Sequence, residues 1–171
     1  MATYDQNNAE CFVFTFKEGL LSPVAHDLRI KVERFSIEVS EGSVVARFDT
    51  SSLRVDTPMK DGRENPSALG ERDKAKIADQ IREEVLHSAR YPEARFQSSS
   101  VEKRADGGYH LTGELTLHGV TRALEAHTEA VGSGQRLAVT LHQPDFGIVP
   151  FKAMMGTLKV QAKVEVRITT R

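Results

Sequence analysis

The chain has too few cysteines for the cross-links and metal motifs that many small domains depend on. Its 171 residues include one cysteine, Cys11, and no tryptophan. A single cysteine excludes an intrachain disulfide and the zinc motifs built from paired cysteines. Cys11 falls in an alternating segment, where a cysteine behaves as a small apolar strand residue.

An excess of charge of one sign and long hydrophobic runs are also missing. There are 23 lysines and arginines against 24 aspartates and glutamates, which gives a net charge near -1. This balance gives no reason to expect nucleic acid as a partner. No apolar stretch approaches the roughly 20 residues that a membrane-spanning helix needs, so no transmembrane segment is predicted.

The first ten residues, MATYDQNNAE, contain neither the basic region nor the apolar region of a signal peptide. We therefore expect a cytoplasmic protein. A chain trimmed of its signal would look the same and would be periplasmic. The length suits one domain over residues 1–171 with a sizeable core.

What the sequence does contain is alternation of apolar and polar residues. It is clearest over 109–117, where Tyr109, Leu111, Leu115 and Leu117 share one face, and His118-Gly119 then gives a turn. This pattern predicts a half-buried antiparallel hairpin. Similar alternation recurs along the chain and predicts about eight strands in an all-β antiparallel barrel, closed by pairing of the last strand with the first. The other alternating stretches are 11–17, 28–39, 44–55, 137–141 and 158–168.

One segment has the period of a helix. Ile77, Ile81 and Val85 are spaced four residues apart, and the opposite face is charged. The spacing predicts one helix inserted between strands over about 73–87, with Asp73 as its cap.

Two segments have no period. Residues 57–72 hold prolines and glycines among charges, which predicts an exposed loop. Residues 142–157 also hold two prolines and two glycines but are rich in apolar side chains. The second segment therefore either plugs one end of the core or forms an apolar portal to a cavity.

Several short motifs resemble one known family. The run YHLTGELTLHGVTRAL over 109–124 resembles the LT-(I/L)-HGVT signature of YceI-like proteins. The other matching motifs are Tyr91-Pro92 with Phe96 and Ser98, the Asp145-Phe146-Gly147-Ile148 segment, and the Arg72-Asp73 pair. The resemblance runs from about residue 10 to 170 and implies a lipocalin-like eight-stranded barrel that binds a polyisoprenoid or similar long-chain amphiphile inside.

On this basis we expect a non-enzymatic binding or carrier protein. The alternative is a barrel with a filled core that acts in a stress response or in regulation through protein contacts. Dimerisation through outer strands would suit a barrel of this type, although no residue identifies it.

The expected ligand-binding wall consists of the apolar residues of the alternating strands and of the irregular segment: Phe12, Phe14, Phe16, Leu28, Ile30, Leu115, Leu117, Val139, Phe146, Phe151, Met154, Met155, Val160 and Val164. A polar head group would remain near the mouth, where Arg29, Arg72 or Lys152 could meet it.

Catalytic and metal-binding patterns are missing. The six histidines include no HExxH pair, and no GxSxG motif is present. His26 and Asp27 are neighbours on a predicted strand and would point to opposite faces. We therefore expect no catalytic residue, no metal and no cofactor. A weaker alternative is an enzyme built on convergence of His26, His118 and His142.

Overall fold

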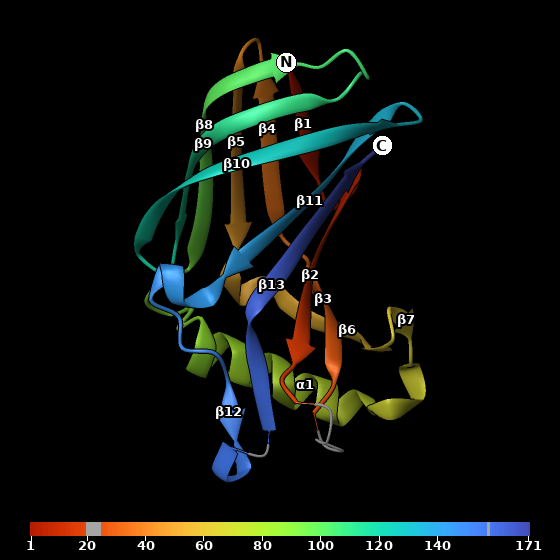
Figure 1. Ribbon diagram of the computed structural model, residues 1–171, viewed down its shortest axis with the longest axis vertical. Coiled ribbons are helices and arrows are strands. Elements are labelled where there is room, and N and C mark those ends of the chain that lie inside the picture. Colours follow the sequence, from red (N-terminus) through yellow and green to blue (C-terminus); the bar gives the residue numbers. More distant parts are fainter. Residues whose placement is uncertain (20–24, 157) are drawn as a thin grey trace.

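The computed structural model describes residues 1–19, 25–156 and 158–171. The described chain is mainly antiparallel β-structure with one helix, as the sequence predicts (Figure 1). Its strands are β1 (Ala2–Asp5), β2 (Ala9–Lys17), β3 (Asp27–Val32), β4 (Phe35–Ser40), β5 (Ser43–Asp49), β6 (Leu53–Lys60), β7 (Arg63–Glu64), β8 (Glu93–Lys103), β9 (Tyr109–Leu117), β10 (Val120–Val131), β11 (Gly134–His142), β12 (Lys152–Ala153) and β13 (Leu158–Thr170).

Eight strands close the barrel if each kinked strand is counted once. β3 continues into β4 and β5 into β6, and these two kinked strands pair with each other through β4–β5 and β3–β6. From β5 the pairing runs through β8, β9, β10, β11 and β13 to β2, and β2 pairs with β3. The predicted pairing of the last long strand with the first long strand is therefore confirmed. The short strands β1, β7 and β12 are additions to this circuit.

The kink between β3 and β4 follows from the sequence. Leu28, Ile30 and Val32 are buried, and the buried series resumes one position out of phase at Phe35 and Ile37. The predicted phase slip is present, but the structure breaks the strand into two rather than forming a single β-bulge. Both halves thereby keep their apolar faces toward the core, because a slip without a bend would turn one half outward.

The central hairpin is formed by β9 and β10, as predicted. His118 and Gly119 both have positive φ, 54° and 74°, which is the backbone of the tight turn that suits two twisted strands. Gly113 lies so close to β8 that a Cβ atom there would fall 2.3 Å from the Gln97 carbonyl oxygen. The glycine in the apolar series thus marks a close approach of two strands.

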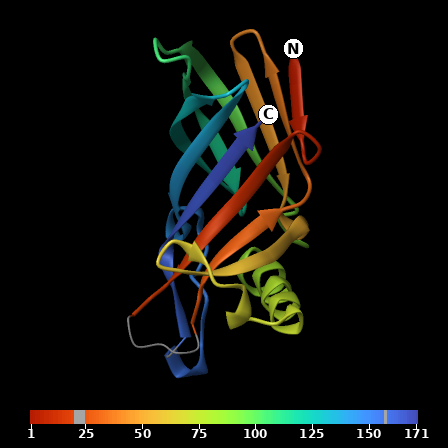
Figure 2. The ribbon, with the colours of Figure 1, turned by 90° about the vertical axis from the view of Figure 1, so that its right-hand side faces the viewer.

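Helix α1 (Glu71–Gln80) continues through a π-helical turn, Ile81–Val85. The predicted cap at Asp73 is wrong, because the helix begins two residues earlier and Gly70 occupies the N-cap position. Asp73 instead lies in the first turn, where a negative charge favours the helix dipole. Figures 1 and 2 place α1 at the end of the barrel opposite both termini, which we call the lower end.

The segment 57–72 is only partly the exposed loop that its composition predicts. Thr57 to Lys60 extend β6, and both Thr57 and Pro58 are buried. Pro58 pairs with Leu28 of β3, and the pairing of β6 with β7 begins only at Met59. Pro58 therefore lies where β6 has a strand neighbour on one side only, a position that tolerates a residue without an amide hydrogen. The exposed part begins at Lys60.

We predict that Gly113→Ala lowers the free energy of unfolding by about 2 kcal/mol or more, because the new methyl group would force β8 and β9 apart. Gly70→Ala is the matched control, since a Cβ atom there meets nothing within 4 Å and φ is not positive. The control should cost less than about 1 kcal/mol. Urea unfolding of both variants measures the difference, and equal stability would contradict the close approach.

Candidate ligand cavity

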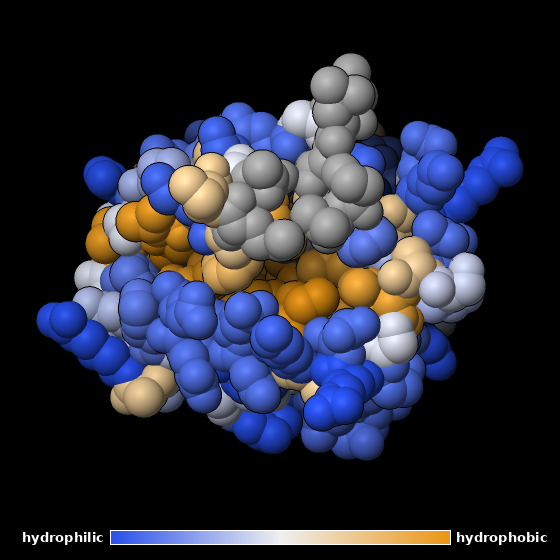
Figure 3. Space-filling view, turned by 90° about the horizontal axis from the view of Figure 1, so that it is seen from below, coloured by the Kyte–Doolittle hydropathy of each residue, from blue (hydrophilic) through white to orange (hydrophobic). Residues whose placement is uncertain are grey.

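The barrel encloses a cavity of about 760 Å³. Its wall is formed by the inward faces of the long strands and by the apolar face of α1, including Ile77, Ile81 and Val85. The helical face predicted from spacing is therefore turned toward the barrel interior. Seen from the lower end, apolar residues form a hollow within a largely hydrophilic rim (Figure 3).

Nine of the residues predicted to contact a ligand line this cavity. They come from β3, β9, β11, β13 and the segment after β11: Leu28, Ile30, Leu115, Leu117, Val139, Phe146, Phe151, Val160 and Val164. Their placement agrees with the sequence analysis, and contact with a ligand stays a prediction.

The prediction that Phe12, Phe14 and Phe16 line the cavity is wrong. The opposite parity of β2 faces inward, so that Cys11 and Val13 contribute to the wall. The reason lies in packing, because the three phenylalanine rings are covered on the outer surface by cationic side chains from β3 and β13. Arg29 lies 5.2 Å from the Phe12 ring centroid, Arg167 lies 4.3 Å from that of Phe14, and Lys163 lies 4.8 Å from that of Phe16.

The irregular apolar segment divides into two parts. Phe146 and Ile148 are buried and line the cavity together with Phe151. Met155 is fully exposed and does not line the cavity, so its predicted place in the wall is wrong. Met155 sits in a turn at φ 56°, which directs the chain away from the core. The side chain of Met154 lies outside the part of the chain that the structure describes.

None of the three predicted head-group residues lines the cavity. Arg29 points outward from β3 and pairs with Asp56 at 2.5 Å and with Glu64 at 2.7 Å. Arg72 is exposed on α1, and Lys152 is exposed on β12. The parity of β3 explains Arg29, because its neighbours Leu28 and Ile30 occupy the inner face.

One group of polar lining residues lies toward the upper end, and the sequence analysis missed it. Thr128 donates a hydrogen bond of 2.7 Å to Gln135, and its hydroxyl oxygen accepts one of 2.9 Å from the Tyr109 amide. Lys103 and Glu41 also line the cavity near this end. Thr128 follows Leu124 and Ala126 on the inward face of β10. A threonine at the next position of an otherwise apolar series is the sequence pattern that could have predicted this polar group.

Cys11 lies in the wall and is almost fully buried. Burial raises the pKa of its thiol to about 12, because an apolar surrounding disfavours the thiolate. The thiol is therefore neutral near pH 7, which is unfavourable for a nucleophile.

Four of the histidines form two contacting ring pairs, His87 with His118 and His110 with His127. Among the described residues, no three His, Cys, Asp or Glu side chains are grouped as metal ligands. His118 instead packs on Tyr91 and His87, with ring centroids 4.5 and 5.5 Å apart, and His26 belongs to the cavity wall. In the same described part, no helix is long and apolar enough to cross a membrane.

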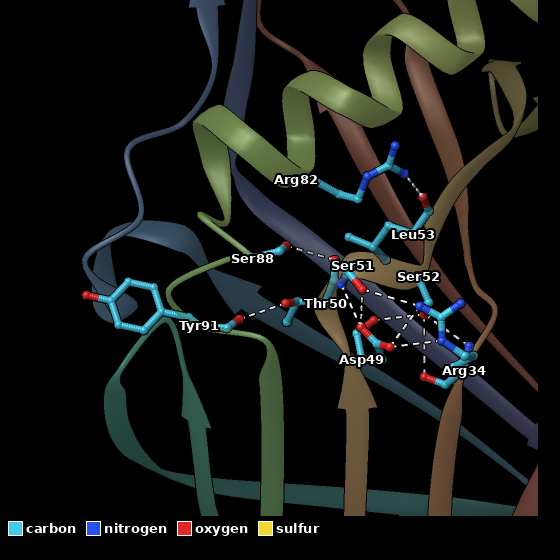
Figure 4. A network of polar contacts seen from close by, with 9 residues as sticks. All are labelled: Arg34, Asp49, Thr50, Ser51, Ser52, Leu53, Arg82, Ser88 and Tyr91. Atoms are coloured by element: carbon cyan, nitrogen blue, oxygen red, sulfur yellow. Dashed lines mark hydrogen bonds and ion pairs between the residues drawn. The ribbon is translucent and has the colours of Figure 1, made fainter.

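The end of the helix is fastened to the kink between β5 and β6 (Figure 4). Arg82 donates a hydrogen bond of 2.9 Å to the Leu53 carbonyl, and Ser88 donates one of 3.0 Å to the Thr50 carbonyl. The Thr50 hydroxyl in turn donates to the Tyr91 carbonyl at 2.7 Å. These bonds hold the cavity-lining face of the helix in place over the barrel interior.

The same kink is braced by an ion pair between Arg34 and Asp49 at 2.9 Å. Burial alone would raise the pKa of the Asp49 carboxyl. Hydrogen bonds from Ser51 and Arg34 outweigh that effect, and the pKa falls below its ordinary value of 3.8.

The chain matches the family model described as a YceI-like domain over residues 4–171. A UPF0312 protein of Shewanella denitrificans is 33% identical over 98 residues, which are 57% of this chain and 43% of that protein. A UPF0312 protein of Shewanella sp. strain ANA-3 is 44% identical over 52 residues, 30% of this chain and 27% of that protein. The matched stretches thus span less than half the length of these relatives.

Solved structures share the fold. Burkholderia cenocepacia BcnA superposes with a TM-score of 0.67 at 15% identity, covering 94% of each chain. A polyisoprenoid binding domain from Saccharophagus degradans gives 0.63 at 11% identity, covering 99% of this chain and 96% of that one. The YCEI protein of Campylobacter jejuni gives 0.57 at 14% identity, covering 91% of each.

We predict that Asp49→Asn destabilises the protein near pH 7 and that the difference from the unchanged chain shrinks as the pH falls below about 4. A carboxyl whose pKa is lower in the folded state stabilises it above the unfolded pKa, and this contribution is lost on protonation. Urea unfolding of both proteins at pH 7 and near pH 3 measures it. A difference independent of pH would contradict a role for the charge.

Proposed function

This chain belongs to the YceI-like family, and we propose that its barrel binds the apolar tail of a polyisoprenoid or similar long-chain amphiphile as a carrier and catalyses no reaction. The observation that carries this proposal is the apolar cavity of about 760 Å³. Cavities of this size commonly accommodate small organic ligands. The solved domain from Saccharophagus degradans, described as polyisoprenoid binding, supports the ligand class.

The volume sets a scale for the ligand. A water-sized group occupies about 30 Å³ in a liquid, so 760 Å³ corresponds to about 25 carbon groups. Loose packing of a bent chain lowers this to about 20, or roughly four isoprene units of five carbons each. Strand β13 has 13 residues and at about 3.3 Å per residue is roughly 43 Å long, so a tail of this size fits along the tilted wall.

Burial of such a tail would bind it firmly. At about 0.8 kcal/mol per methylene, 20 buried carbon groups would contribute roughly 16 kcal/mol before losses. Association and ordering of a flexible chain remove at least about 4 kcal/mol of this. A tail that left half of its length outside would gain too little for retention at low concentration.

The distribution of charge in the wall bears on the head group. Lys103 is the only lysine or arginine among the described lining residues, and Glu41 lines the same cavity. A pyrophosphate buried inside would need several cations or hydrogen-bond donors directed at it. The lining therefore favours a ligand whose inner part is uncharged and whose charged group, where it has one, stays at an open end.

The alternative of a filled core has less support. A filled barrel of eight strands has side chains that meet across its centre and leaves few voids larger than a water molecule. The small inward side chains of Cys11, Val13 and Thr15 instead leave the space open, while the large rings of the same strand face outward.

We expect the purified protein to retain a long-chain lipid at close to one molecule per chain. Native mass spectrometry, followed by mass spectrometry after solvent extraction, would measure this and identify the ligand class. Absence of any bound mass, together with no uptake of added polyprenyl or fatty ligands, would contradict the proposal.

We expect Val139→Trp to reduce retention of the ligand at least about tenfold while changing the free energy of unfolding by less than about 2 kcal/mol, because the ring enters open space. Val139 lines the cavity, whereas its neighbour Thr140 is exposed on the outer face of β11. Thr140→Trp is therefore the matched control and should leave retention unchanged. Severe unfolding of Val139→Trp alone would indicate a filled core instead.

A further inference from the structure

The chain carries an uninterrupted basic stretch beside the lower end of the cavity. Between Asp145 and Glu165 the sequence has three lysines and no acidic residue. Two of these, Lys152 and Lys159, are direct partners across the β12–β13 pair. Like charges directly opposite each other destabilise a strand pair, so this arrangement favours an anionic surface that would offset the repulsion.

Exposed apolar side chains accompany these lysines. Val149 is 72% exposed and Met155 is 104% exposed. The other exposed large apolar residues among the described positions are Met1 at the N-terminus and Val131, 40% exposed, at the end of β10, and both lie away from α1. Lys152, Met155 and Lys159 border one small surface hollow, and we call these three residues the basic tip.

The position of the basic tip links it to the cavity. Figures 1 and 2 show the turn after β12 projecting beyond α1, at the lower extreme of the molecule. Phe151, next to Lys152, lines the cavity, and so does Leu158, next to Lys159. A partner surface in contact with the basic tip would therefore also lie close to this end of the cavity wall.

We propose that the basic tip docks on an anionic phospholipid bilayer, with Met155 inserted among the lipids and Lys152 and Lys159 against the head groups. Passage of a long-chain ligand between the bilayer and the cavity rests on the proposed function; docking itself does not.

Neighbouring charges leave the tip with a positive balance. Lys17 lies opposite Val160, and its amide donates to the Asp27 carboxylate at 2.7 Å. Glu18 is exposed, and its amide donates to the Lys159 carbonyl at 2.9 Å. The three lysines, Lys17, Lys152 and Lys159, thus outnumber the two nearby acids, of which Glu18 lies beside Lys159 and Asp27 lies on β3. Lys152 and Lys159 form no ion pair with another described residue.

The few charged and apolar groups of the basic tip predict weak binding to a membrane. Each lysine near an anionic membrane strengthens binding about fivefold, an effect that falls with salt. Two lysines and one apolar side chain then give reversible association rather than permanent anchoring. Such association suits a protein that collects a lipid and leaves with it.

The test is sedimentation of the full chain with vesicles of phosphatidylcholine alone or with about 30% phosphatidylglycerol. We expect binding to the anionic vesicles that weakens with salt, and at least about a tenfold loss in the variant Met155→Ser with Lys152→Gln and Lys159→Gln. The matched control is Val131→Ser with Arg136→Gln and Arg104→Gln, which removes the same kinds of group at the other end and leaves the cavity lining unchanged. This control should sediment like the unchanged chain.

Ligand uptake separates the two proposals. A polyprenyl ligand delivered in detergent should load the tip variant and the unchanged chain equally, whereas transfer from anionic vesicles should be slower in the variant. Failure of the unchanged chain to sediment, or equal loss in the control, would overturn docking even if detergent loading succeeds. If no protein, including the unchanged chain, takes up the ligand from detergent, the proposed ligand binding in the cavity is wrong. The sedimentation result then still decides membrane docking.

Discussion

The closed circuit of antiparallel pairing is the constraint on which the rest of the structure depends. Pairing of β13 with β2 sets Val166 opposite Val13 and Ile168 opposite Cys11, and all four side chains face the cavity. Once this register is fixed, alternation assigns the inner and outer face of both strands. The three phenylalanines of β2 are then outside, where Arg29, Arg167 and Lys163 cover them.

The hollow interior is a consequence of which residues this register turns inward. Small and medium side chains line the wall, and α1 lies across the lower end next to the kink between β5 and β6. Hydrogen bonds from Arg82 and Ser88 to backbone carbonyls of the kink hold the helix there. Closure by a helix rather than by filling side chains leaves a long apolar space, which is the basis for the proposed lipid ligand.

Ligand binding and membrane docking would use different parts of the molecule. The cavity offers an apolar wall with polar groups toward the upper end, including Thr128 and Gln135. The basic tip offers exposed lysines and an apolar side chain at the lower extreme. The two features consist of different side chains with different chemistry, so each can be altered without the other.

The sequence by itself determined the strand pattern, the central hairpin with its turn at His118-Gly119, the apolar face of the helix and the family, because these depend on local periodicity and short motifs. It could not determine which face of β2 points inward, since Phe12, Phe14 and Phe16 form the more hydrophobic face and only pairing with β13 turns it outward. It also could not place Arg29 or Met155, because ion pairs with Asp56 and Glu64 and the turn after β12 are set by tertiary contacts. The tertiary structure alone decided that the barrel is hollow, because a cavity depends on side chains from every strand at once.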